Sequence, residues 1–164
     1  MTSNEMTKWG IGRKLSRISF LYLAFTVILS YLRPDIFTIP QIPLSVSAVL
    51  GTMFLIVGFI LWGLGALEVR KAYNEERLLT TGVYAVVRNP MYSGFIIFIP
   101  LALALWFRSW LMLTVPLVAY AVFSVLIKKE AEYLQEKFGQ TYLDYKSKVH
   151  ALLPFPRFSK YEKK

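Results

Sequence analysis

The chain has 164 residues, of which 55% are hydrophobic; it carries a net charge of +9, no cysteine and one histidine. This length indicates one domain, 1–164, and the hydrophobic share exceeds that of an ordinary soluble domain. The lack of cysteine excludes a disulfide framework, a thiol nucleophile and a thiolate metal site. Because His150 is the sole imidazole, a histidine-based metal centre lacks ligands, and we expect no metal site.

The placement of the charges argues against nucleic acid as the partner and for a membrane. Residues 44–67, 89–107 and 109–127 are free of charge, and each run is close to the roughly 20 apolar residues that cross a bilayer. Residues 18–32 form a shorter run without a small-residue cleavage site, so we expect a span that needs snorkelling side chains or a thinner bilayer. The sequence therefore predicts an all-α, polytopic integral membrane protein with four transmembrane helices, at about 18–32, 44–67, 91–107 and 109–127.

Residues 1–17 form a basic leader that we expect to lie on the membrane surface as a short amphipathic piece. After the first span, Pro40 and Pro43 make the connection irregular, since two prolines so close cannot both lie inside a helix. In the second span Gly51, Gly58 and Gly65 recur every seven residues and share one face, where we expect another helix to pack closely.

The charged residues that follow, 68–88, are expected to be solvated, first on a helical continuation and then at the turn Thr80-Thr81-Gly82. The third span is interrupted by Pro100. Residues 108–110 are expected to form a tight hairpin, and Pro116 to bend the fourth span.

The basic residues predict the topology. Seventeen of the nineteen Lys and Arg residues lie in the leader, between the second and third spans, or after Ile127. With four spans these segments share one side, which the positive-inside rule makes cytoplasmic. We therefore expect both termini and the candidate site to face the cytoplasm.

The tail continues as a cytoplasmic helical segment. Residues 128–138 are good helix formers, and Gly139 is expected to cap that helix. Tyr142, Tyr145 and Val149 then continue an apolar face at helical spacing.

Two groups of polar residues are expected to meet at this membrane surface, one in 84–92 and the other in 130–145. Pro90 forces Asn89 out of the helical region, so the third span should begin near Pro90, where free N–H groups can bind an anionic or polar group. Glu130 lies where the fourth span leaves the membrane. The spacing predicts a pocket at the cytoplasmic interface, open to water and to lipid, without naming its ligand.

The motif Thr-Gly-x-Tyr-x-x-x-Arg-x-Pro-x-Tyr-x-Gly at 81–94 is followed by an uncharged hairpin. The motif Glu-x-x-x-Leu-x-x-x-Phe-Gly-x-x-Tyr-x-x-Tyr-x-x-x-Val then occupies 130–149. This ordered pair of motifs resembles the isoprenylcysteine carboxyl methyltransferase family and its phospholipid N-methyltransferase relatives, over a catalytic core of about 66–156. The resemblance implies methyl transfer from S-adenosylmethionine, with S-adenosylhomocysteine as product, to a lipid or prenylated acceptor that arrives from the bilayer.

Carried over by position, the resemblance implies a cofactor site and two residues with catalytic roles. Glu130 would hold the ammonium group of the cofactor, and Arg88 would lie near the acceptor. The residues lining the cofactor site would be Tyr84, Val87, Asn89, Pro90, Tyr92, Glu130, Tyr142 and Tyr145.

The chain departs from the family pattern at two positions. The family's His is Asn89 here, which can hydrogen-bond but cannot titrate near neutral pH. The family's paired Glu-Glu is Glu130-Ala131, and Glu132 is rotated from the second position by about 100° on a helix. An amine acceptor needs a base, for which Glu130, Glu132 and the tyrosines remain, so a carboxylate or thiol acceptor is slightly favoured.

Plainer explanations exist for each residue taken singly. Arg88 could be a positive-inside anchor, the tyrosines an interfacial aromatic belt, Asn89 a turn residue, and Glu130 a counter-charge for Lys128 and Lys129. Their joint spacing favours an O-methyltransferase, with a phospholipid or amine N-methyltransferase or a thiol S-methyltransferase as alternatives. A lipid-binding membrane scaffold is the non-enzyme alternative, and no obligate protein partner is indicated.

Overall fold

The computed structural model describes residues 11–75 and 77–153. Within these ranges the chain is helical, with an isolated bridge between Thr38 and Ser109 and no strand, as the all-α prediction expected. The helices are α1 (Gly12–Leu32), α2 (Pro34–Phe37), α3 (Leu44–Glu75), α4 (Val83–Val86), α5 (Pro90–Ser93), the π-helix η1 (Gly94–Phe98), α6 (Ile99–Trp106) and α7 (Thr114–Lys148).

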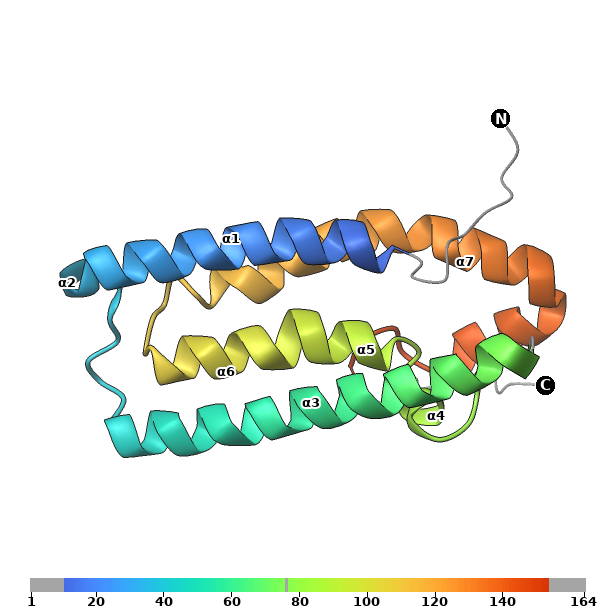
Figure 1. Ribbon diagram of the computed structural model, residues 1–164, viewed down its shortest axis with the longest axis horizontal. Helices are drawn as coiled ribbons and strands as arrows, with labels where there is room; N and C mark the ends of the chain where they lie inside the picture. The colour runs from blue at the N-terminus through green and yellow to red at the C-terminus, as the bar shows by residue number, and fades with distance from the viewer. Residues whose placement is uncertain (1–10, 76, 154–164) are drawn as a thin grey trace, which may run out of the picture.

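The long helices run side by side along the longest axis of the molecule (Figure 1). Helix α1 packs on α7, whereas α3 packs on α5, η1 and α6, and contacts of η1 and α6 with α7 join the two pairs. The start of α1, the end of α3, α4, the start of α5 and the bend of α7 meet at one end of the bundle (Figure 1), which we call the α4 end.

Two helical stretches, Gly12–Leu32 and Leu44–Lys71, are long and apolar enough to cross a membrane. Pro90–Trp106 is a shorter apolar helix. Large apolar side chains point outward from the bundle; Leu21 on α1 and Leu117 on α7 are each 70% exposed. Apolar surface of this extent suits contact with lipid.

The first span starts earlier than the sequence predicts and ends at Leu32 as predicted. Helix α1 begins at Gly12 and not at residue 18, so its 21 residues reach the length of a normal span without a thinner bilayer. Arg13, Lys14 and Arg17 therefore lie on the first turns of this helix. The rest of the predicted surface leader, 1–10, lies outside the described residues.

The fourth long helix begins at Thr114, so the predicted start at 109 is wrong. Residues 107–113 form turns in place of a three-residue hairpin, held by a hydrogen bond of 2.7 Å between the hydroxyls of Ser30 and Ser109. Pro116 consequently falls in the first turn of α7, where a missing N–H leaves no helical carbonyl unpaired, and it is not a bend inside the span.

The predicted close packing along α3 is confirmed. A Cβ atom added to Gly58 would lie 3.0 Å from the side chain of Ile99, and one added to Gly65 would lie 2.8 Å from that of Met91. On the facing helix, Gly94 packs against the backbone of Gly58. The small residues thus let α3 and the Pro90–Trp106 stretch approach at backbone distance.

The interruption expected at Pro100 takes the form of the π-helix η1. The N–H of Ile99 donates to the carbonyl of Gly94, the wider i to i+5 spacing. Pro100 has no N–H to donate to Ile96, and the extra residue in this turn lets the helix continue through the proline without a break.

We predict that Gly58→Ala lowers the thermal unfolding temperature of the detergent-purified protein, because its methyl group must displace α6; overpacking of this kind costs about 1–3 kcal/mol. The matched control is Gly63→Ala, since a Cβ at Gly63 meets nothing within 4 Å. Equal unfolding temperatures for the two variants would show that α3 does not depend on this close approach.

Candidate functional site

The candidate site starts where the chain turns after α3. Gly82 has φ of 59°, a left-handed conformation that favours glycine, and it precedes α4. The buried Tyr84 on α4 donates a hydrogen bond from its hydroxyl to the carbonyl of Gly65, at 3.4 Å. Asn89 has φ of −130° and Pro90 opens α5, so the predicted start of this helix is confirmed.

Residues 150–152, which we call the C-terminal strap, dock on this turn. The backbone N–H of Arg88 donates a hydrogen bond to the carbonyl oxygen of His150 at 2.9 Å. The backbone N–H of Asn89 donates one to the carbonyl oxygen of Ala151 at 3.0 Å. The side-chain amide of Asn89 donates to the same carbonyl of Ala151 at 3.1 Å, and the hydroxyl of Ser93 donates to the carbonyl of Leu152. The amide of Asn89 is thus engaged in holding the strap.

Glu130 lies on α7 at the edge of this region. The hydroxyl of Tyr92 donates to Glu130 Oε2 at 3.3 Å, and the ring of Tyr92 packs on that of Phe123 at a centroid distance of 5.6 Å. Burial raises the pKa of the Glu130 carboxyl, and the hydrogen bond from Tyr92 opposes this rise. The pair therefore presents a poorly hydrated carboxylate, the kind of group that binds a cation strongly.

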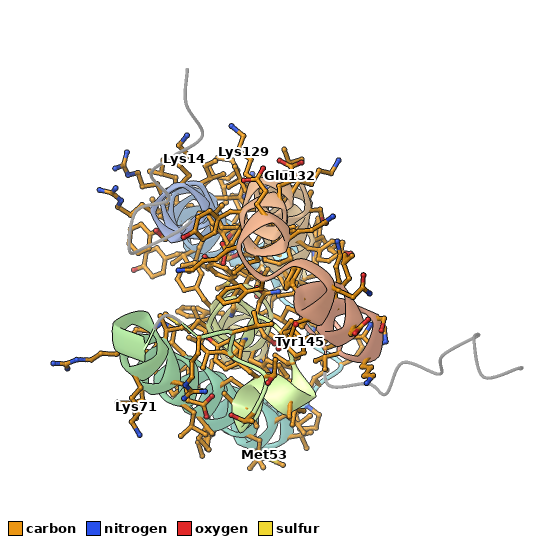
Figure 2. The ribbon with its side chains drawn as sticks, turned by 90° about the vertical axis from the view of Figure 1, so that its right-hand side faces the viewer. Lys14, Met53, Lys71, Lys129, Glu132 and Tyr145 are labelled. Atoms are coloured by element: carbon orange, nitrogen blue, oxygen red, sulfur yellow. The ribbon has the colours of Figure 1, made fainter. Side chains whose placement is uncertain are left out.

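A bend at Gly139 turns the last part of α7 towards α4 (Figure 1). Gly139 has φ of 53°, so the helix break predicted there is confirmed. Beyond it, Tyr142 is only 4% exposed, and the hydroxyl of Tyr145 donates to the carbonyl of Tyr84 at 2.6 Å. The view onto the α4 end (Figure 2) shows Tyr145 directed towards the middle of the molecule.

Arg88 lies beside the two tail tyrosines. Burial raises the pKa of Tyr142 and of Tyr145, and the positive charge of Arg88 lowers both, a partial compensation. Burial likewise raises the pKa of Tyr84. These phenols therefore stay protonated at neutral pH and act as neutral hydrogen-bond donors.

The structure brings together most of the residues singled out from the sequence. We call the following six side chains the site cluster: Tyr84, Arg88, Tyr92, Glu130, Tyr142 and Tyr145. Val87 is 1% exposed, and Pro90, also buried, packs on Gly65, so these two residues contribute packing next to the cluster. Hollows of about 330 Å³ and 280 Å³ lie elsewhere, around Thr52 and Glu132.

Two acidic residues differ in outcome. Glu132 is exposed and points away from the bundle (Figure 2), as its one-residue offset from the family's second carboxylate suggested. Glu68, by contrast, is predicted from the sequence to be solvated, but the structure exposes it only in part: its Oε2 atom is buried, and its carboxyl group lies against Gly82. The spacing in the sequence could have indicated this partial burial, since Glu68 follows Gly65 by three residues and therefore shares the packed face of α3.

The family model described as phospholipid methyltransferase matches residues 46–141, more than half of the chain. A probable protein-S-isoprenylcysteine O-methyltransferase of Oryza sativa subsp. indica is 29% identical over an alignment of 114 residues, and the match covers 64% of this chain and 60% of that protein. The protein-S-isoprenylcysteine O-methyltransferase of Schizosaccharomyces pombe is 36% identical over 84 residues, 51% of this chain and 36% of that protein. No solved structure matches.

These matches cover at most about 60% of the relatives' own length. The residues matched by the family model include the turn at 80–92 and Glu130. The apolar helices agree with an integral membrane protein. The chain therefore belongs to the phospholipid methyltransferase family of membrane proteins, in which it is similar to the protein-S-isoprenylcysteine O-methyltransferases.

Proposed function

We propose that this protein transfers a methyl group from S-adenosylmethionine to a lipophilic acceptor in the membrane, most closely to the carboxylate of an isoprenylcysteine-type substrate. The observation that carries the proposal is the partly buried, hydrogen-bonded pair of Tyr92 and Glu130, which lies close enough to Arg88 for both charges to act on Tyr142. Membership of the family and the names of the relatives support the same reaction class.

The side chains fit the methyl donor, which bears an ammonium, a sulfonium and a carboxylate. Glu130 would hold the ammonium group, since a buried carboxylate gains most from an ionic partner. Tyr84, Tyr92, Tyr142 and Tyr145 would line the site, joined by Val87, Asn89 and Pro90. When bound, the donor supplies a methyl group on a good leaving group, so the protein needs no nucleophile of its own.

Arg88 would position the acceptor carboxylate. A carboxylate is already a nucleophile, so orientation and exclusion of water supply much of the acceleration. An amine acceptor would first have to lose a proton. Asn89 cannot take that proton, and its amide already donates to Ala151. These facts favour O-methylation over N-methylation of a phospholipid or another amine. S-methylation of a thiol is the other alternative.

We further propose four membrane crossings, by α1, α3, the Pro90–Trp106 stretch and the apolar first half of α7. The termini and the site cluster would then face the cytoplasm. The described basic residues near the α4 end, among them Lys14, Lys71 and Lys129, support this orientation (Figure 2). The acceptor would reach the cluster from the bilayer, and a lipid-binding scaffold remains the non-enzyme alternative.

We predict micromolar binding of S-adenosylmethionine and S-adenosylhomocysteine to the detergent-purified protein, measured by calorimetric titration. Glu130→Ala should weaken both by about tenfold or more, because both ligands carry the ammonium and lose a charge-assisted hydrogen bond. Glu132→Ala, which removes an exposed carboxylate two residues away, should bind like the wild type. A folded, monodisperse wild type that binds neither ligand would rule out the enzyme and favour the scaffold.

The same titration should depend on pH. Binding of the ammonium requires ionised Glu130, whose pKa is raised by burial, so in the range where the ammonium keeps its proton the affinity falls on acidification. The fall should begin at a higher pH than for an exposed carboxyl group, within a scan from about pH 8 to pH 5, with a proton released on binding. Glu130→Gln should bind more weakly with no such fall; an unchanged pH profile in this variant would assign the titration to another group.

The acceptor class can be tested with labelled methyl donor. We expect label on a farnesylated cysteine derivative, released by mild alkali as an ester is, and none on phosphatidylethanolamine. Arg88→Gln should lower kcat/KM for the cysteine derivative by about tenfold or more, the worth of a charge-assisted pair, whereas the exposed Arg70→Gln should not. Alkali-stable label on the phospholipid would instead establish N-methylation.

A further inference from the structure

Glu68 is a partly exposed acidic residue with one buried carboxylate oxygen, and the proposed reaction has not yet used it. Its Oε2 atom is inaccessible to solvent and has no hydrogen-bond partner among the described residues. A buried carboxylate oxygen without a partner costs free energy unless a cation or a donor completes it. A glutamate in this position therefore calls for a ligand.

The position of Glu68 on α3 places it next to the site cluster. Gly65, three residues earlier on the same face of α3, accepts the hydrogen bond from Tyr84, whose own carbonyl accepts one from Tyr145. The Cδ atom of Glu68 lies 3.0 Å from the point that a Cβ on Gly82 would occupy, so only glycine leaves room for this carboxyl group. Two carboxylates from two different helices, Glu68 on α3 and Glu130 on α7, thus lie at the same group of side chains.

The electrostatics agree with this placement. Burial first, and then charges that include those of Glu130 and Glu68, raise the pKa of Tyr84. The charge of Glu68 also contributes to the raised pKa of Tyr145, after burial and the effects of Arg88 and Tyr142. Both carboxylates therefore act on the phenol group of Tyr84.

We propose that Glu68 is a second cofactor-binding carboxylate and that its partner is the sulfonium of the methyl donor. The inference rests on the proposed function, in which Glu130 already holds the ammonium group. The donor has one further positive charge, and a sulfonium carries no N–H, so it is recognised by an oxygen whose lone pairs are not engaged in a hydrogen bond. Glu68 Oε2 is such an oxygen.

A consequence is discrimination between donor and product. Transfer of the methyl group removes the positive charge from sulfur, while the ammonium and the carboxylate are unchanged. Glu68 therefore attracts the donor and gains nothing from the product, which favours release of S-adenosylhomocysteine. Glu130 makes no such distinction, because both molecules carry its partner.

The test is calorimetric titration of full-length Glu68→Gln with both molecules. Glutamine keeps the shape of the side chain and removes its charge. We expect the affinity for S-adenosylmethionine to fall about tenfold or more and that for S-adenosylhomocysteine to change by less than about twofold. Binding of the product in the same sample shows that the variant is folded and its site intact. Glu132→Gln, which removes an exposed charge, should leave both affinities unchanged.

The outcomes separate this inference from the proposed function. If the wild type binds neither molecule, the proposed function fails and the inference with it. If the wild type binds both, and Glu68→Gln weakens both equally or neither, the role of Glu68 is refuted while the cofactor site stands. Selective loss of the donor supports the inference.

Discussion

The site depends on the hydrogen bonds between residues 88–93 and the C-terminal strap. Backbone and side-chain donors of Arg88, Asn89 and Ser93 bond to three successive carbonyls of residues 150–152. These segments are about 60 residues apart in the chain, so the bonds join the start of α5 to the end of α7. Because both carry site residues, a shift of the strap would separate Arg88 from the tail tyrosines.

Much of this arrangement could be predicted from the sequence, where local rules suffice. Pro90 determines where α5 begins, and Gly139 determines where α7 bends. The seven-residue spacing of Gly51, Gly58 and Gly65 predicts the face of α3 that packs closely. The structure confirms all three predictions. Each rests on a backbone property of one residue type, a fixed φ in proline or a missing Cβ in glycine, which the fold cannot override cheaply.

The errors arose where tertiary contacts outweigh local pattern. An uncharged run does not reveal a helix start, because Ser109 satisfies its hydroxyl by pairing with Ser30 across the bundle and belongs to a turn. A run of charged residues does not reveal that one carboxylate oxygen of Glu68 is buried, since its carboxyl group lies against Gly82, fourteen positions later. The strap was also invisible to periodicity, as its bonds use backbone carbonyls, which carry no sequence signal.

Asn89 occupies the position of the histidine in the family pattern, and in this structure it has a structural role that needs no titratable group. The amide of Asn89 meets a structural requirement by donating to Ala151, and no side chain of the site cluster has an unperturbed pKa near neutrality. Phenols kept neutral by burial can orient a ligand without adding charge. The charged side chains nearby are Arg88, Glu130 and Glu68; their net charge of −1 would complement the net charge of +1 on the proposed methyl donor. Under the proposed function, such a site would work by charge complementarity and positioning, and a carboxylate acceptor, which needs no base, would suit it best.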